Sequence, residues 1–206
     1  MRDVIDDPGR RRFVRLALAA PVVVAAGFGL PWPAELAAAA AARAALTPEC
    51  GDGDEPTPEE TAGPFFKPRS PLRTSLLEPG VRGTRIVVSG RVFGRECRPL
   101  AGALLDFWHA GDDGEYDNQG FRLRGHQFAD EDGRYHLETV VPGLYPGRTR
   151  HYHVRVQAPG GRVLTTQLYF PGEARNRRDF LYRPDLLMAV ERGSGQGHFH
   201  FMLDQA

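Results

Sequence analysis

The sequence has little lysine, little cysteine and no long uninterrupted hydrophobic run. Lys67 is its only lysine, and 26 basic side chains balance 26 acidic ones across 206 residues. No basic patch with interleaved aromatic residues stands out, which argues against nucleic acid as a partner. The apolar run over residues 16–30 contains Pro21, Gly27 and Gly29, and a membrane-spanning helix needs about 20 apolar residues. A membrane-anchoring helix is the alternative there, but we expect the mature chain to have no membrane partner.

The first 45 residues have the order of an export signal. Residues 9–15 form a twin-arginine pattern, the apolar run follows, and residues 37–45 are rich in alanine with small-x-small cleavage sites. We therefore expect residues 1–45 to be removed and the mature chain to be extracellular or periplasmic. Twin-arginine export carries folded proteins, so this route allows a cofactor to be loaded before translocation.

The two cysteines both lie beyond this signal. Cys50 follows Thr-Pro-Glu, so no cysteine after the apolar run stands in a lipid-attachment context. An exported chain meets an oxidising compartment, where cysteines tend to pair. We expect a Cys50–Cys97 disulfide that tethers the mature N-terminal arm to the body of the domain; two unpaired thiols are the alternative.

The rest of the chain divides into an arm and one all-β domain. Residues 46–60 are rich in Pro, Gly, Asp and Glu and are expected to form an irregular N-terminal arm. Residues 61–206 contain short β-branched and alternating segments between glycines and prolines, which predicts a β-sandwich of mixed sheets with long functional loops. We expect a Gly- and Asp-rich loop over 107–133, and one short helix over 179–192 that Pro184 limits. The predicted strands are 84–93, 100–108, 133–140, 151–156, 163–170 and 198–203.

Two histidines on one predicted strand are the strongest sign of chemistry. His151 and His153 are two residues apart, so their side chains point to the same face of a strand and can bind one metal ion. Tyr116 and Tyr145 lie upstream and offer phenolate oxygens, which are hard anionic ligands that suit Fe(III) better than zinc. The alternatives are a polar strand face for the histidines and an ordinary loop aromatic for Tyr116.

The order of these residues resembles that of the intradiol ring-cleavage dioxygenases, the non-haem Fe(III) enzymes related to protocatechuate 3,4-dioxygenase and catechol 1,2-dioxygenase. The resemblance runs from Thr61 to the C-terminus and is greatest to the compact exported branch of the family. Each motif is weak alone, but their order is specific. The matching segments are TAGPFF (61–66), the stretch from Trp108 to Tyr116, DGRY (132–135), PGLYP (142–146) and TQLYF (166–170).

The resemblance implies that Tyr116, Tyr145, His151 and His153 bind a non-haem Fe(III) ion. It also implies that one tyrosine leaves the ion when a catechol binds, so that its phenolate accepts a substrate proton. The implied reaction cleaves the aromatic ring of a catechol-type substrate with O2 and yields a cis,cis-muconate-type diacid.

Further roles follow from the same resemblance. Arg148 would stabilise charge that develops on the substrate, and Gln167 would lie in the site. Thr61, Gly63, Pro64 and Phe65 would form one wall of the substrate pocket. The family often has Tyr at the position of Phe65.

Two differences from the family limit what the resemblance implies. The segment between Tyr145 and Arg148 is shorter than in the well-known intracellular members. The chain also lacks the helical N-terminal dimerisation region of catechol 1,2-dioxygenases. The identity of the catechol and the formation of a homo-oligomer are therefore left open.

Two other classes of protein compete with this interpretation. A cupin also has His-x-His on a strand, but expects a glutamate a few residues later, which residues 154–159 do not contain. An exported non-catalytic β-sandwich binding module would explain the export signal and the strands, but not the two tyrosines and two histidines in this order. The second His-x-His pair, His198 and His200, has no nearby Tyr, Cys or carboxylate to complete a metal-ligand set.

Overall fold

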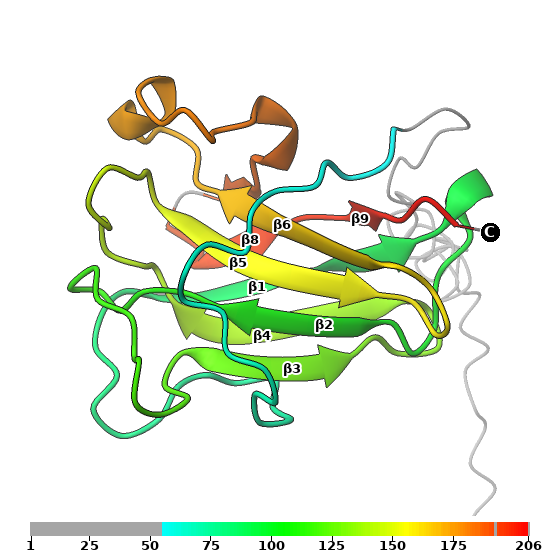
Figure 1. Cartoon of the computed structure of the whole chain (residues 1–206), viewed down its shortest axis with the longest axis horizontal. Helices are drawn as coiled ribbons and strands as arrows, with labels where there is room; N and C mark the ends of the chain where they lie inside the picture. Colours follow the sequence, from blue (N-terminus) through cyan, green and yellow to red (C-terminus); the bar gives the residue numbers. More distant parts are fainter. Residues whose placement is uncertain (1–54, 192, 206) are drawn as a thin grey trace, which may run out of the picture. The chain divides into compact units, whose positions relative to one another are not determined.

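The computed structural model describes residues 55–191 and 193–205. These residues form nine strands and three short 3-10 turns (Figure 1). The turns are η1 (Arg95–Cys97), η2 (Ala174–Arg177) and η3 (Pro184–Leu186). Within these ranges no helix is long and apolar enough to cross a membrane. The predicted export signal and Cys50 lie outside the described residues.

The first sheet mixes parallel and antiparallel pairing. It contains β1 (Arg85–Phe93), β4 (Arg134–Val140), β7 (Ala189–Glu191), β8 (Gln196–His198) and β9 (Phe201–Met202). The strand order is β4-β1-β8-β7, and β9 pairs with the last residues of β1. β1 runs antiparallel to β4 and parallel to β8 and β9.

The second sheet is antiparallel throughout and has the order β3-β2-β5-β6. Its strands are β2 (Leu104–Trp108), β3 (Arg124–Phe128), β5 (His151–Gln157) and β6 (Val163–Tyr169). The register pairs Trp108 with both Arg124 and His153, and pairs His151 with Tyr169. These residues therefore gather at one end of the sheet, on the left in Figure 1.

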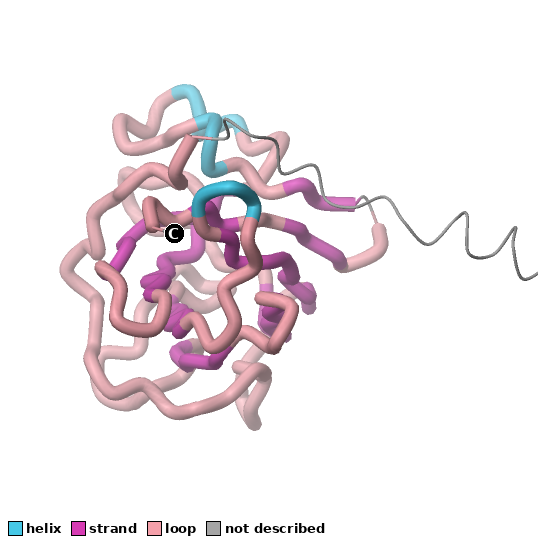
Figure 2. The backbone as a smooth tube through the Cα atoms, turned by 90° about the vertical axis from the view of Figure 1, so that its right-hand side faces the viewer, coloured by secondary structure: helices cyan, strands magenta, loops and turns pink. Residues whose placement is uncertain are grey.

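The two sheets pack face to face around one hydrophobic core, which Figure 2 shows end-on as two layers of strands. Alternation along β5 decides which side chains enter it. Tyr152, Val154 and Val156 are fully buried in the core. His151 and His153 point to the opposite face of the sheet, and the segment that contains Gly63 lies against His153 there. The chain before and after Gly63 crosses this face of the sheet (Figure 1).

The all-β sandwich is confirmed, and three local predictions were wrong. The helix predicted over 179–192 is absent; this segment holds η3 and β7, because Pro184 cannot continue a helix. The loop predicted over 107–133 contains β3, an edge strand whose sequence Arg-Gly-His-Gln-Phe lacks β-branched residues. The strand predicted over 198–203 is split between β8 and β9. Residues 55–60 have no regular secondary structure.

His109 joins the two sheets, and its burial should make the stability of the fold sensitive to acid. Its Nε2 lies 2.7 Å from Thr139 Oγ1 in β4, and its Nδ1 lies 2.8 Å from the Ala110 carbonyl. Burial lowers the pKa of His109 from 6.5 to about 4. The unfolded chain therefore binds this proton at higher pH than the folded chain does, and stability falls as the pH drops from 6.5 toward 4.

We expect His109 alone to reduce the free energy of unfolding by about 2–3 kcal/mol between about pH 7.5 and about pH 4.5. Urea unfolding of chelator-treated protein at the two pH values measures the loss. A His109→Gln variant cannot take up this proton and should lose correspondingly less over the same interval. An equal loss in the variant would contradict the assignment.

Candidate metal centre

The two histidines of β5 meet at their Nε2 atoms. Both rings are buried, with exposed fractions of 4% for His151 and 2% for His153, and the two Nε2 atoms lie 3.2 Å apart. Two imidazole nitrogens that share one metal ion at about 2.1 Å and at a right angle are separated by about 3 Å. This spacing therefore fits two ligands of one ion.

Hydrogen bonding and charge also fit a metal. Nδ1 of His151 lies 2.7 Å from the Thr149 carbonyl and must carry the proton, so Nε2 of the neutral ring presents a lone pair. Burial and the Arg148 charge lower the pKa of His151 to about 4. Burial, followed by His151 and Arg148, lowers the pKa of His153 as well. Both rings are thus neutral near pH 7, the state in which imidazole binds metals.

Tyr116 lies near His153 and Tyr145 lies near Tyr116, and the two loops that carry them touch each other. Tyr116 lies 5.9 Å from Tyr145 and 6.3 Å from His153 between ring centroids. The loops are joined where Gly143 N donates to the Gly111 carbonyl at 2.6 Å. Gly114 has φ of +84°, and a Cβ there would lie 2.6 Å from the Leu144 carbonyl oxygen. Glycine is required for the approach that brings the phenols together.

The tyrosines differ in how firmly they are held. Tyr116 is buried and stacks on Phe65, with ring centroids 4.3 Å apart, while Tyr145 is half-buried and meets the edge of Phe65 at 5.4 Å. Burial raises the pKa of Tyr116, against the opposing charges of Arg148 and Arg124. Its phenol therefore stays protonated unless a strong cation lies beside it.

Arg148 and Gln167 are in contact at the same end of the sheet. Arg148 Nη2 donates to Gln167 Oε1 at 2.6 Å, and Gln167 Nε2 donates to the Thr61 carbonyl at 3.0 Å. Gln167 is paired with His153 in the register of β5 and β6, so the two side chains share a face. The structure therefore places both predicted residues beside the histidines.

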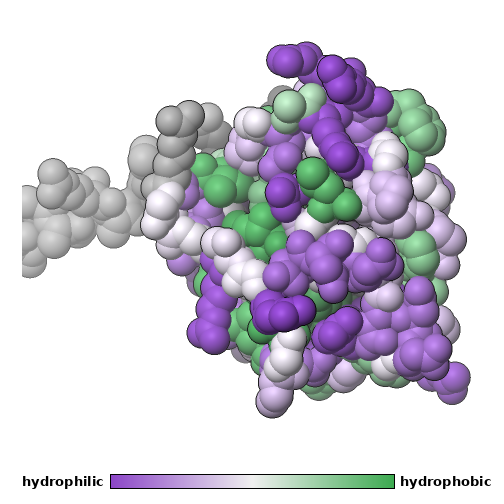
Figure 3. All heavy atoms as spheres, turned by 90° about the vertical axis from the view of Figure 1, so that its left-hand side faces the viewer, coloured by the Kyte–Doolittle hydropathy of each residue, from purple (hydrophilic) through white to green (hydrophobic). Residues whose placement is uncertain are grey.

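The predicted wall segment crosses the same face. Gly63 has φ of +63°, and a Cβ there would lie 3.4 Å from His153 Cε1 and 3.6 Å from Nε2. Thr61 Oγ1 accepts the Gly63 amide at 3.1 Å and stabilises this turn. Phe65 contacts both tyrosines, whereas Pro64 is exposed. Figure 3 shows this end of the molecule, with hydrophobic side chains toward the middle and hydrophilic ones around them.

Three residues of the site had no role in the sequence prediction. Trp108 stacks flat on His153, with ring centroids 4.9 Å apart and an interplanar angle of 2°. The buried Arg124 donates to the Phe65 carbonyl at 2.6 Å, and Asp179 accepts from Arg148 Nε. For Trp108, the alternation of side-chain direction along β2 could have predicted its place on the same face as the site. No sequence signal distinguished Arg124, because arginine is abundant in this chain. None distinguished Asp179, because it was assigned to a predicted helix.

The second His-x-His pair was expected to have no carboxylate nearby, which is wrong, because Glu191 Oε1 lies 3.8 Å from His198 Nε2. His198 Nδ1 lies 2.9 Å from Ser89 Oγ, and His200 Nδ1 accepts the Arg91 amide at 2.9 Å, so both are hydrogen-bonded to β1. In the described part of the chain, no group of three His, Cys, Asp or Glu side chains is placed to hold a metal. A centre at His151 and His153 therefore depends on the tyrosines.

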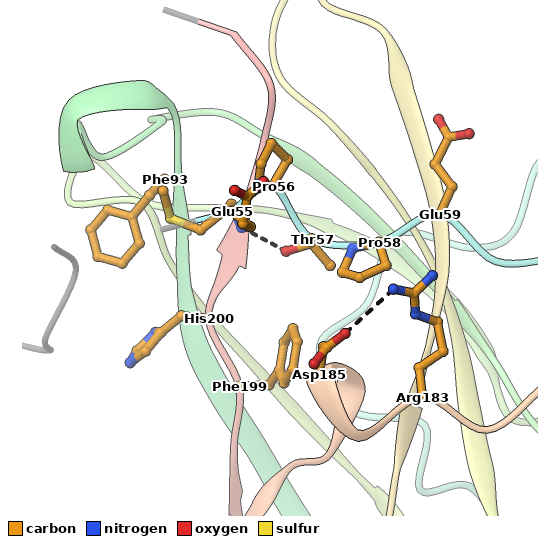
Figure 4. A pocket seen from close by; sticks show the side chains of 11 residues that line it. Glu55, Pro56, Thr57, Pro58, Glu59, Phe93, Arg183, Asp185, Phe199 and His200 are labelled. Carbon is orange, nitrogen blue, oxygen red and sulfur yellow. Dashed lines mark hydrogen bonds and ion pairs between the residues drawn. The ribbon is translucent and has the colours of Figure 1, made fainter. Parts of the chain in front are cut away.

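A cavity of about 770 Å³ lies apart from these residues (Figure 4). It is bounded by residues 55–59, Phe199 and His200, and by the ion pair of Arg183 with Asp185. None of the predicted site residues lines it. Its acidic side chains are exposed, and the buried Thr57 hydroxyl already accepts the Met202 amide at 2.8 Å, so the cavity offers few groups to orient a ligand. The candidate site is therefore the histidine–tyrosine cluster.

Cys97 is disulfide-bonded. Its predicted partner Cys50 lies outside the described residues, so their pairing stays a prediction.

Comparison with known proteins identifies the family. A family model described as "Dioxygenase" matches residues 62–200. Catechol 1,2-dioxygenase 2 of Acinetobacter lwoffii is 32% identical over 164 residues, which is 66% of this chain and 60% of that protein. Hydroxyquinol 1,2-dioxygenase of a Rhizobium species is 31% identical over 147 residues, which is 58% of this chain and 50% of that protein. The chain thus matches only about half to 60% of the length of these curated relatives.

Comparison with solved structures identifies the same family. The dioxygenase domain of a dioxygenase–carbohydrate-binding protein fusion from the cellulolytic bacterium Streptomyces sp. SirexAA-E is 58% identical, with a TM-score of 0.72 over 74% of this chain and 100% of that chain. Catechol 1,2-dioxygenase of Pseudomonas arvilla C-1 is 28% identical, with a TM-score of 0.64 over 73% of this chain and 62% of that chain. The chain belongs to the intradiol dioxygenase family.

Proposed function

We propose that the protein is a non-haem Fe(III)-dependent intradiol dioxygenase. Its reaction cleaves the ring of a catechol-type substrate with O2 between the two hydroxylated carbons and yields a cis,cis-muconate-type diacid. The observation that carries the proposal is the pair of buried Nε2 atoms of His151 and His153, 3.2 Å apart, with Tyr116 near His153 and Tyr145 near Tyr116. The names of the relatives, catechol and hydroxyquinol 1,2-dioxygenases, support the substrate class.

Tyr116, Tyr145, His151 and His153 would hold the ion. A trivalent cation beside the phenols opposes the effect of burial on their pKa and favours two phenolates, whose charge in turn favours the oxidised metal. When bound there, Fe(III) would draw electron density from a catecholate and make a ring carbon reactive toward O2.

The chain's own residues would receive the substrate proton and balance its charge. Tyr145 is half-buried while Tyr116 is held under Phe65, so Tyr145 Oη is the phenolate with room to accept a proton from an incoming catechol. The guanidinium of Arg148 supplies positive charge for the catecholate. Phe65 and Trp108 cover the site with aromatic surface and keep water away from the reacting atoms.

Oxygen uptake tests the proposal. Iron-replete protein is expected to consume one molecule of O2 per molecule of ring cleaved with at least one of catechol, hydroxyquinol and protocatechuate, and to absorb visible light by phenolate-to-iron charge transfer. Iron-free protein is the control and should be colourless and inactive. A colourless iron-replete protein that consumes no O2 with any of the three would support a non-catalytic binding module instead.

A further inference from the structure

Arg148 is held from two sides. Its Nε lies 2.9 and 3.1 Å from the two carboxylate oxygens of Asp179, and its Nη2 lies 2.6 Å from Gln167 Oε1. The Arg148 side chain is 11% exposed and that of Asp179 is 1% exposed. A long flexible side chain thus has one orientation, set by a carboxylate at Nε and an amide oxygen at Nη2.

The Arg148 guanidinium acts on the residues of the candidate metal centre. Its positive charge contributes to lowering the pKa values of His151 and His153, and it opposes the rise in the pKa of Tyr116. Its effect on substrate charge falls with distance, so the orientation of the guanidinium determines how much charge it can stabilise.

Asp179 is itself fixed by the backbone. Its Oδ2 accepts the Thr149 amide at 2.8 Å, and its Oδ1 accepts the Leu181 amide at 3.0 Å. Burial disfavours the charged carboxylate, but these two amides and Arg148 outweigh burial and lower the pKa of Asp179. The carboxylate is therefore an ionised, immobile anchor that joins the segment before β5 to the loop between η2 and η3.

We propose that Asp179 is a positioning residue for Arg148: it orients the guanidinium toward the substrate and makes no contact with the substrate itself. The inference rests on the proposed function, because it assigns a role within the same reaction. The alternative is that Asp179 only ties down the loop between η2 and η3.

Asp179→Asn separates the two interpretations, because the amide keeps the size of the side chain and loses its charge. We expect kcat with catechol to fall by about 10- to 100-fold, the range for partners that orient catalytic groups, with iron content and the visible band unchanged. The double variant Asp179→Asn/Arg148→Lys should be no slower than Arg148→Lys alone, because both changes remove the same interaction. Multiplicative losses, or an unchanged kcat in Asp179→Asn, would overturn the proposal.

Asp185→Asn is the matched control. Asp185 lies in the same part of the chain and pairs with Arg183 at 3.3 Å (Figure 4). This pair is exposed and makes no hydrogen bond to Arg148. Its kcat should equal that of the parent protein. If Asp179→Asn does not fold, Asp179→Glu replaces it, because its longer side chain shifts the carboxylate. Asp179→Glu should lower kcat by less than Asp179→Asn does. Added to Arg148→Lys, it should cause no further loss of kcat.

A measurement without iron separates failure of this inference from failure of the proposed function. In the iron-free protein, the Arg148 Nε–H should give a slowly exchanging nitrogen–proton NMR signal that Arg148→Lys removes. This signal should be lost in Asp179→Asn and kept in Asp185→Asn. Its persistence in Asp179→Asn refutes the positioning role, whereas a parent protein that turns over no catechol but shows the expected NMR pattern refutes only the ring-cleavage function.

Discussion

Replacing His153 by alanine is expected to remove iron from the protein, abolish its visible band and lower kcat/KM by at least about 100-fold. Even partners of metal ligands cost about 10- to 100-fold in affinity or activity when they are removed, and His153 is proposed as a ligand itself. Its Nε2 lies 3.2 Å from that of His151, and no other imidazole in the described part of the chain approaches His151 as closely. Metal analysis and the visible spectrum measure the effect.

The chain supplies a matched control in its second His-x-His pair. The double variant His198→Ala/His200→Ala removes two histidines with the same spacing from β8 and the residues after it. Both are exposed and bonded to β1, so their removal should leave iron content and the spectrum unchanged. Equal loss of iron in the two variants, or full iron content in His153→Ala, would refute the ligand assignment.

Trp108→Ala is expected to reduce the free energy of unfolding by about 3–5 kcal/mol and to weaken iron binding. Trp108 is 1% exposed, stacks on His153, and meets the edge of Phe66 with ring centroids 4.9 Å apart. Its loss leaves a cavity between the sheet and the covering segment. It also frees the His153 ring, whose Nδ1 makes no hydrogen bond of normal geometry.

Urea unfolding of the iron-free protein measures the stability, and titration with iron measures the affinity. Phe128→Ala is the control, because Phe128 lies in the same sheet but is 56% exposed. Its free energy of unfolding should change by no more than about 0.5 kcal/mol. A loss below about 1 kcal/mol for Trp108→Ala would show that the indole is not part of the packed structure.

The fold class and the family could be predicted from the amino-acid sequence. The β-branched and alternating segments, and the glycines and prolines between them, are local features of the sequence. They predicted a β-sandwich that the structure confirms. The spacing of His151 and His153 is also local, because strand geometry alone places both side chains on one face. The tyrosines were recognised through the order of motifs, which is a property of the whole sequence.

The contacts between residues far apart in the sequence could not be predicted and are seen in the folded chain alone. The Asp179 carboxylate reaches Arg148 across 31 positions, and the two tyrosine loops touch where Gly114 meets Leu144. No local pattern encodes these contacts, because they depend on how the loops at one end of a sheet fold over each other. β3 was predicted wrongly because pairing at a sheet edge outweighs weak local propensity. The segment over 179–192 was predicted wrongly because Pro184 cannot continue a helix, and its residues bond to Tyr169 of β6 instead.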